Sequence, residues 1–192
     1  WVSQHPVILD ELLNPLSDAK HIGLESLKHE LGRRLESIKG DLEAEMDIMR
    51  EFKNGYFLRL AAMATAGLIE DMEVRRCLTD LAETVLYHSV IIAEESMNPR
   101  YKAEVADYRD QLFFGIVAYG KLGSAELSYH SDLDIVYLYD GGSSGLSTDV
   151  LSHFFSRLSQ RLQHVLNTTT RAGILYETDI RLRPSGRSGA MV

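Results

Sequence analysis

Two aspartates one residue apart, Asp132 and Asp134, have the type and spacing that could do chemistry. Side chains alternate between the two faces of a strand, so both carboxylates point the same way if the run 132–140 is a strand. Two like charges this close repel each other, and a cation between them reverses that cost. Such a pair suits Mg²⁺, which prefers oxygen ligands and completes its shell with water and phosphate oxygens. The alternative is a solvated Asp132 at the strand start with an exposed Asp134.

A glycine turn at 120–124 (GKLGS) comes shortly before this pair, and its backbone N–H groups could hold a phosphate. The run 174–183 (ILYETDIRLR) is expected to be a later strand that carries a third carboxylate, Asp179. Four charged residues would share one face of that strand: Glu177, Asp179, Arg181 and Arg183. Four charges in a row indicate either a solvent-exposed face or, together with the pair above, one wall of a site for a polyanion.

The elements that must position these residues are predicted to form a small mixed sheet with helical cover. Short apolar, aromatic and β-branched runs predict strands at 113–119, 132–140 and 174–183. The run 135–139 is apolar on both faces, which favours a strand buried deep in the sheet. Ser147 or Thr148 can cap a helix that has apolar residues on its inner face up to Val165.

The N-terminal part is predicted to be a bundle of amphipathic helices. Apolar residues recur every three or four positions over 24–52, with Glu, Lys and Arg on the other face and a bend or break at Gly40. Two more helices are expected at 55–66 and 70–95. The predicted fold class is therefore α+β, with a helical region at 1–111 packed on a mixed sheet at 112–192.

Composition and charge narrow the function classes. The 192 residues are 45% apolar, and the net charge is −8. Residues 1–111 hold 13 Lys and Arg against 21 Asp and Glu, whereas residues 112–192 hold seven of each, so the acidic excess is N-terminal. With no run of basic residues, a long nucleic acid is disfavoured as a partner. The longest nearly uncharged apolar stretch, 112–119, is too short to span a membrane.

The cellular setting is expected to be the cytoplasm. The lone Cys77 excludes an internal disulfide framework and fits a reducing compartment. Because the chain opens at Trp1 with neither an initiator Met nor a signal segment, we expect an excised piece of a longer cytoplasmic protein.

The glycine turn followed by the pair Asp132 and Asp134 resembles the motif of the nucleotidyltransferase superfamily that includes DNA polymerase β. Leu122-Gly123-Ser124, a spacer of seven residues and Asp132-Leu133-Asp134 match its pattern of a hydrophobic residue, Gly and Gly or Ser, followed by Asp-hydrophobic-Asp. The spacer is shorter than in many members, so the helix within it must be abbreviated. Within the superfamily, the segments 115–140 and 173–192 look like the glutamine synthetase adenylyltransferase family, and 173–186 is closer to its adenylylating C-terminal half.

This resemblance implies a polymerase-β-like fold and a set of roles. Asp132 and Asp134 would hold two Mg²⁺ ions, and Asp179 would complete the ion that binds the attacking oxygen. ATP would be the substrate, a tyrosine hydroxyl of glutamine synthetase the nucleophile, and pyrophosphate the leaving group; a PII signalling protein and glutamine would regulate the reaction. The residues that would contact the nucleotide are Gly123, Ser124, Lys121, Ser131, Arg181 and Arg183. Of these, Lys121 could instead lie on the turn surface, Ser131 could only begin the strand, and the arginines could pair with Glu177 or Asp140.

Three other functions stay open from the sequence. The same carboxylates could run the reverse, phosphorolytic removal of AMP, or the chain could be a regulatory nucleotide- or partner-binding module without turnover. A polynucleotide polymerase is disfavoured by the acidic N-terminal region. His130 is expected to be a loop residue because Mg²⁺ prefers oxygen, and Glu126 could be either a ligand or a cap.

Overall fold

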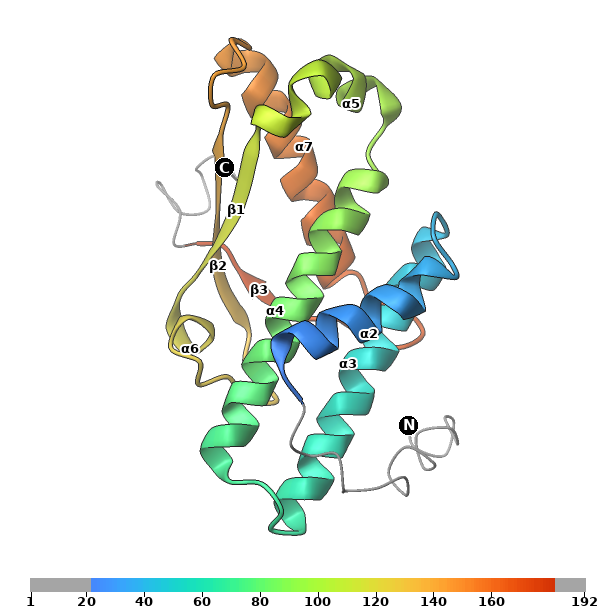
Figure 1. The fold of residues 1–192 in the computed structure, drawn as a ribbon, viewed down its shortest axis with the longest axis vertical. Helices are drawn as coiled ribbons and strands as arrows, with labels where there is room; N and C mark the ends of the chain where they lie inside the picture. The colour runs from blue at the N-terminus through green and yellow to red at the C-terminus, as the bar shows by residue number, and fades with distance from the viewer. Residues whose placement is uncertain (1–21, 182–192) are drawn as a thin grey trace.

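The computed structural model describes residues 22–181 and is an α+β arrangement, mostly helical with a small three-stranded sheet (Figure 1). Helices come first along the chain: α2 (Leu24–Glu36), α3 (Leu42–Thr65), α4 (Asp71–Glu95) and α5 (Pro99–Val105). Helices and strands then alternate: the 3₁₀ helix η3 (Ala106–Gln111), β1 (Phe113–Ala118), α6 (Gly120–Gly123), β2 (Leu133–Asp140), α7 (Thr148–Asn167) and β3 (Thr178–Asp179).

The chain breaks between α2 and α3 at Gly40, whose φ of +91° is costly for residues with a Cβ. The Asp41 side chain then caps α3 by accepting from the Ala44 N–H, while the Gly40 N–H donates to the Glu45 carboxylate at 3.0 Å. The break predicted at Gly40 is confirmed. The separate helix predicted at 55–66 is wrong, because α3 continues through Gly55 to Thr65.

The sheet has the order β1-β2-β3. β1 pairs antiparallel with β2, from Phe113 opposite Asp140 to Ala118 opposite Ile135. β2 pairs parallel with β3, and this pairing places Asp134 opposite Asp179. β3 is shorter than the described part, 174–181, of the strand predicted at 174–183, because the chain before Thr178 makes other contacts; residues 182 and 183 lie outside the described residues.

The inner face of the sheet packs against the helices. Leu133, Ile135 and Tyr137 of β2 are buried, whereas Leu138 is 51% exposed on the outer face. The prediction that β2 is buried on both faces is therefore wrong. Stacking of Phe155 from α7 on Phe114 and Tyr139 joins the helical layer to the sheet.

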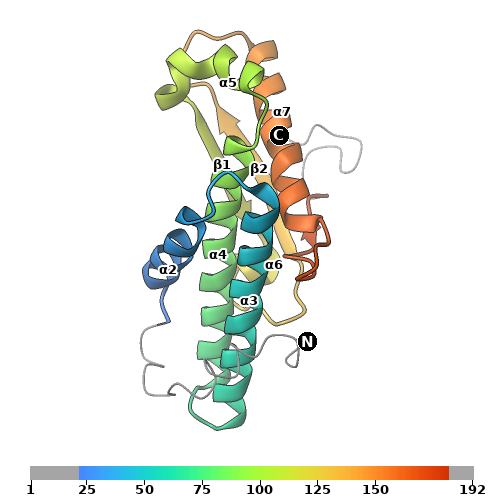
Figure 2. The same ribbon diagram turned by 90° about the vertical axis from the view of Figure 1, so that its right-hand side faces the viewer.

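One hydrophobic core joins the helices to the sheet and contains residues from both sides of position 112. The two views show α3 and α4 as long neighbouring helices, with α7 beside α4 (Figures 1 and 2). The predicted helix at 70–95 is confirmed by α4, which begins one residue later. Within residues 22–181, no helix is long and apolar enough to cross a membrane.

Candidate metal and nucleotide site

Three carboxylates meet at the point where β2 begins and β3 ends. Asp132 directly precedes β2, Asp134 is the second residue of that strand, and Asp179 is the last residue of β3. One oxygen from each side chain lies within 4.8 Å of the others. Asp132 is exposed, whereas the other two are half-buried. The parallel pairing of β2 and β3 thus brings together all three acidic residues that the sequence singled out.

This donor set fits Mg²⁺. All three groups offer carboxylate oxygens, and the partial exposure leaves room for water or phosphate oxygens to complete an octahedral shell. Two oxygens bound to one Mg²⁺ lie at most about 4.2 Å apart, twice the usual ligand distance. Because the three oxygens lie within 4.8 Å of one another, small side-chain rotations are enough to bring them onto one ion.

The glycine turn lies directly against this triad. Gly120 opens α6 with a φ of +52°, and a Cβ on it would be 2.3 Å from the Asp134 Oδ2. The neighbouring backbone holds the same corner, because the Tyr119 N–H donates to the Asp134 carbonyl at 2.8 Å. Glycine is therefore required here for two reasons, the backbone conformation and the space that the carboxylate occupies.

Replacing Gly120 by alanine is expected to displace the Asp134 carboxylate, since the added methyl group would overlap its oxygen. The positive φ adds a backbone cost of about 1–2 kcal/mol. We expect thermal unfolding several degrees below that of the unchanged protein, and Mg²⁺ binding weakened about tenfold or more when measured by calorimetry. Gly145→Ala is the matched control, because Gly145 has a φ of +69° and a Cβ added to it would meet no atom within 4 Å. Equal Mg²⁺ affinities for the two variants would contradict this account.

Arg181 supplies a positive charge at the triad. Its backbone N–H donates to Asp179 Oδ1 at 2.9 Å, and its guanidinium Nε donates to both carboxylate oxygens at 2.8 Å. These hydrogen bonds raise the pKa of Arg181, and the charges of Asp132 and Asp134 raise it further. The prediction that Asp179 and Arg181 share one face of a strand is wrong, because the chain turns after Asp179 and the Arg181 side chain folds back. Its partner is Asp179, and neither Glu177 nor Asp140 as the sequence suggested.

Arg181→Gln is expected to tighten Mg²⁺ binding two- to fivefold, because the guanidinium competes with the cation for Asp179. Solvent screens an exposed charge pair of this kind, and Arg181 is 61% exposed at its side chain, so the expected change is small. Calorimetric titration with Mg²⁺ measures the effect, with Arg157→Gln, an exposed arginine on α7, as the control. Weaker binding in Arg181→Gln would show that Arg181 orders Asp179 instead of competing for it.

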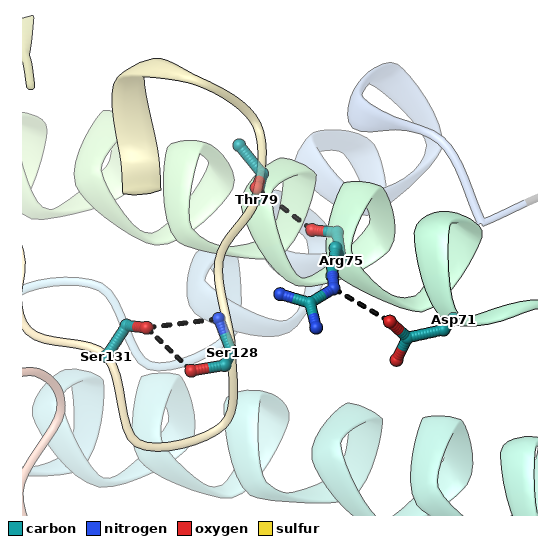
Figure 3. Close-up of polar contacts among 5 residues, drawn as sticks. All are labelled: Asp71, Arg75, Thr79, Ser128 and Ser131. Atoms are coloured by element: carbon teal, nitrogen blue, oxygen red, sulfur yellow. Dashed lines mark hydrogen bonds and ion pairs between the residues drawn. The ribbon is translucent and has the colours of Figure 1, made fainter. Parts of the chain in front are cut away.

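Ser131 is held within its own loop. Its Oγ accepts from the Ser128 N–H at 3.1 Å and lies 2.8 Å from the Ser128 Oγ, so the two side chains point toward each other across a tight turn (Figure 3). The same view shows the loop beside α4, where Arg75 bonds to Asp71 and Thr79 donates to the Arg75 carbonyl. Ser131 therefore closes the loop that delivers Asp132 to the strand.

The other predicted nucleotide contacts lie on or near α6. Lys121 and Gly123 are exposed, and a Cβ on Gly123 would be 2.7 Å from the Ala118 carbonyl oxygen. Ser124 is exposed, and its Oγ faces the Lys121 carbonyl at 3.5 Å. Arg183 lies outside the described residues. Their contact with a nucleotide stays a prediction.

The structure also places His130 and Glu126. His130 is an exposed loop residue, as expected, and lines an apolar cavity of about 510 Å³ between that loop and α3. Glu126 is exposed, and its backbone N–H donates to the Lys121 carbonyl at 2.8 Å. That bond closes the end of the turn around α6.

Sequence reasoning missed two basic residues of α3, Arg50 and Lys53. Charged residues of the run 24–52 were expected on the outer face of its helix, and Lys53 lay between the two helices predicted there. Arg50 is fully buried and Lys53 is 8% exposed. A signal was present, since Arg50 and Lys53 flank the apolar Phe52 at the end of the stripe that begins at Leu24.

The fold and the site together define a class: an α+β protein in which a glycine turn and two parallel strands assemble three carboxylates able to hold a divalent cation. The whole chain, residues 1–192, matches the family described as glutamate-ammonia ligase adenylyltransferase. The chain belongs to this family.

Relatives named bifunctional glutamine synthetase adenylyltransferase/adenylyl-removing enzyme support this membership. The chain is 42% identical to the one from Thioalkalivibrio sulfidiphilus, 40% to that from Nitrosococcus oceani and 37% to that from Haemophilus ducreyi. Each comparison covers 100% of this chain and 20–21% of the relative. The chain therefore spans about a fifth of the length of these relatives, which are named as enzymes.

Proposed function

We propose that this chain carries a nucleotidyltransferase centre that moves AMP from ATP to a tyrosine hydroxyl of glutamine synthetase and releases pyrophosphate. The observation that carries the proposal is the triad of Asp132, Asp134 and Asp179, whose oxygens lie within 4.8 Å of one another. It stands in a chain of the adenylyltransferase family, whose relatives are named for this substrate. The glycine turn, the mixed sheet and the strand-borne carboxylates also favour a polymerase-β-like fold for this part of the protein.

The chain's own residues bind and orient the reactants. Asp132 and Asp134 would hold two Mg²⁺ ions, one of them carrying the triphosphate, and Asp179 would complete the ion that binds the attacking oxygen. When bound, Mg²⁺ would supply charge stabilisation and lower the pKa of the tyrosine hydroxyl, which is about 10 when free. Gly123 and Ser124 would cradle the phosphates, with Lys121 and Arg181 offsetting their charge.

Arg181 can serve both the carboxylates and the nucleotide. Its planar fork matches carboxylate and phosphate groups alike. The guanidinium now bonds to Asp179 and is 61% exposed at its side chain. Release from Asp179 when a cation arrives would free it to bind a phosphate oxygen.

The reverse reaction, phosphorolysis of adenylyl-tyrosine to ADP, would use the same carboxylates. The name of the relatives covers both directions. We favour the adenylylating direction because the sequence at 173–186 resembles the adenylylating C-terminal half of the family more closely than the other half. Regulation by a PII signalling protein and glutamine, and a cytoplasmic location, are part of the same proposal.

Label transfer separates the directions. The protein is incubated with Mg²⁺ and α-³²P-ATP plus unmodified glutamine synthetase, and in parallel with phosphate plus adenylylated synthetase. We expect label on a synthetase tyrosine, lost when a chelator removes Mg²⁺. Formation of ADP in the second reaction with no label in the first would instead establish the adenylyl-removing direction. No product in either, with Mg²⁺-ATP bound, would favour a regulatory module without turnover.

A further inference from the structure

The segment that leads into β3 is held by side chains of α3. Arg50 donates to three carbonyls of this region: Nε to Gly173 at 2.8 Å, and Nη2 to Val165 at 2.9 Å and Thr168 at 2.5 Å. A further bond, from Nη1 to the Met46 carbonyl at 2.7 Å, fixes the guanidinium to its own helix. A single buried cation thus joins α3, the end of α7 and the approach to β3.

Lys53, one turn further along α3, continues this set of contacts. Its Nζ donates to the Ile174 carbonyl at 3.1 Å and the Leu175 carbonyl at 2.8 Å, and lies 5.1 Å from the centre of the Tyr176 ring. Asn54 adds a bond from Nδ2 to the Ala172 carbonyl at 3.2 Å. Three neighbouring polar residues of α3 therefore hold four consecutive carbonyls, those of residues 172–175.

Burying the charges of Arg50 and Lys53 side by side costs free energy. Burial, and then the charge of Arg50, lowers the pKa of Lys53 to about 8. Burial also lowers the pKa of Arg50. Apolar side chains could fill the same space without this cost, so the bonds to the carbonyls are what these residues supply.

β3 cannot fix its own register. Its ladder with β2 consists of Leu133 opposite Thr178 and Asp134 opposite Asp179 within the described chain. One residue of slip would move the Asp179 side chain to the other face of the sheet. The Leu133 N–H does donate to the Glu177 carbonyl at 2.9 Å, but this bond also depends on where the preceding segment lies.

Side chains of α7 also fix the position of β3. The Thr178 Oγ1 donates to the Gln163 Oε1 at 2.9 Å and accepts from the Asn167 Nδ2 at 3.0 Å. The hold on Thr178 fixes the strand at the residue next to Asp179, while α3 fixes the segment that enters it. The two together determine where the third carboxylate lies.

We propose that Lys53 and Arg50 are positioning residues that set the register of β3 and so hold Asp179 opposite Asp134, although neither touches the carboxylates. The proposal rests on the proposed function for the role of Asp179 in turnover, but its structural part is independent of it. It predicts that loss of the Lys53 ammonium loosens β3 from β2 while the pairing of β1 with β2 persists.

Hydrogen exchange on the full protein tests this. In Lys53→Met, exchange of the Leu133 amide, which reports the β2–β3 contact, is expected to speed up at least tenfold. Exchange of the Tyr119 amide, bonded to the Asp134 carbonyl on the β1 side, should change less than twofold. Lys53→Arg should restore slow exchange in part. The control is Lys102→Met, because Lys102 of α5 also donates to a backbone carbonyl, that of Glu95 at the end of α4, at 3.0 Å.

Turnover supplies the second readout, measured well below each variant's unfolding temperature. Lys53→Met should need at least fivefold more Mg²⁺ for half-maximal rate and lose at least tenfold in kcat, with the KM for ATP within threefold. If Lys53→Met does not fold, Lys53→Gln, which keeps a donor without the charge, carries the same test. An unchanged Leu133 amide, or equal acceleration of both amides, overturns the proposal. Altered exchange in a protein whose unchanged form has no turnover supports the positioning role and refutes the proposed function instead.

Discussion

Asp132→Asn is expected to lower turnover by about 10³-fold while the protein stays folded. Asp132 offers one of the three carboxylates at the triad and is exposed. The change removes a charge and keeps the volume, so the core is untouched. Charge stabilisation by a bound metal ion is worth several kcal/mol, and about 4 kcal/mol corresponds to about 10³-fold in rate.

The measurement is the rate of AMP transfer at saturating ATP over a range of Mg²⁺ concentrations. Asp132→Glu, which keeps the carboxylate on a longer arm, should recover part of the activity. Asp107→Asn, at an exposed aspartate on η3, is the matched control and should behave like the unchanged protein. Near-normal turnover in Asp132→Asn would remove this residue from the metal site.

Arg50→Met is expected to lower the free energy of unfolding by about 4 kcal/mol, a large part of the 5–15 kcal/mol typical of a domain. The guanidinium is fully buried, and its loss leaves the carbonyls of Met46, Val165, Thr168 and Gly173 without this donor. The Gly173 carbonyl keeps the Thr170 N–H as a donor, and each buried acceptor that is left unsatisfied costs about 1–3 kcal/mol. Relief of the buried charge, whose pKa is lowered by burial, offsets part of the sum.

Urea unfolding followed by circular dichroism measures this change. Arg50→Lys keeps the charge with fewer well-placed donors, and its free energy of unfolding should lie between those of the unchanged protein and Arg50→Met. Arg157→Met tests an arginine on the exposed side of α7, which bonds to Gln160, and should cost less than about 1 kcal/mol. A similarly small cost for Arg50→Met would show that water replaces the guanidinium at these carbonyls.

Periodicity in the sequence was enough to predict the long helices. The repeat of buried positions along α4, from Val74 to Ile92, follows one helical face, and so does that of α7. It could not show that α3 continues through Gly55, because packing of the helix against its neighbours outweighs the weak helix propensity of one glycine. α5 and η3 were not predicted from the sequence.

The third strand was predicted in the right place but too long, for a different reason. The run 174–183 alternates as a strand would, but the carbonyls of Ile174 and Leu175 bond to Lys53 instead of a neighbouring strand. Such long-range side-chain contacts leave no periodic signal. For the same reason, the buried Arg50 was assigned to the outer face of its helix, and the contacts of Lys53 were not predicted.

The candidate site was predicted in part. Alternation along a strand is enough to place Asp132 and Asp134 on one side, since it is a local property of the backbone. The closeness of Asp179 depends on parallel pairing of β3 with β2, which no local pattern specifies. The contact of Gly120 with the Asp134 carboxylate needs the tertiary turn of α6 as well.

The most direct test of the central claim is a crystal structure of the protein with Mn²⁺ and a non-hydrolysable ATP analogue. An anomalous difference map locates the metal. We predict anomalous peaks bounded by the carboxylates of Asp132, Asp134 and Asp179, with the Arg181 guanidinium moved off Asp179 and the triphosphate beside α6. Metal bound elsewhere, with the nucleotide present and the three carboxylates free of it, would contradict the account.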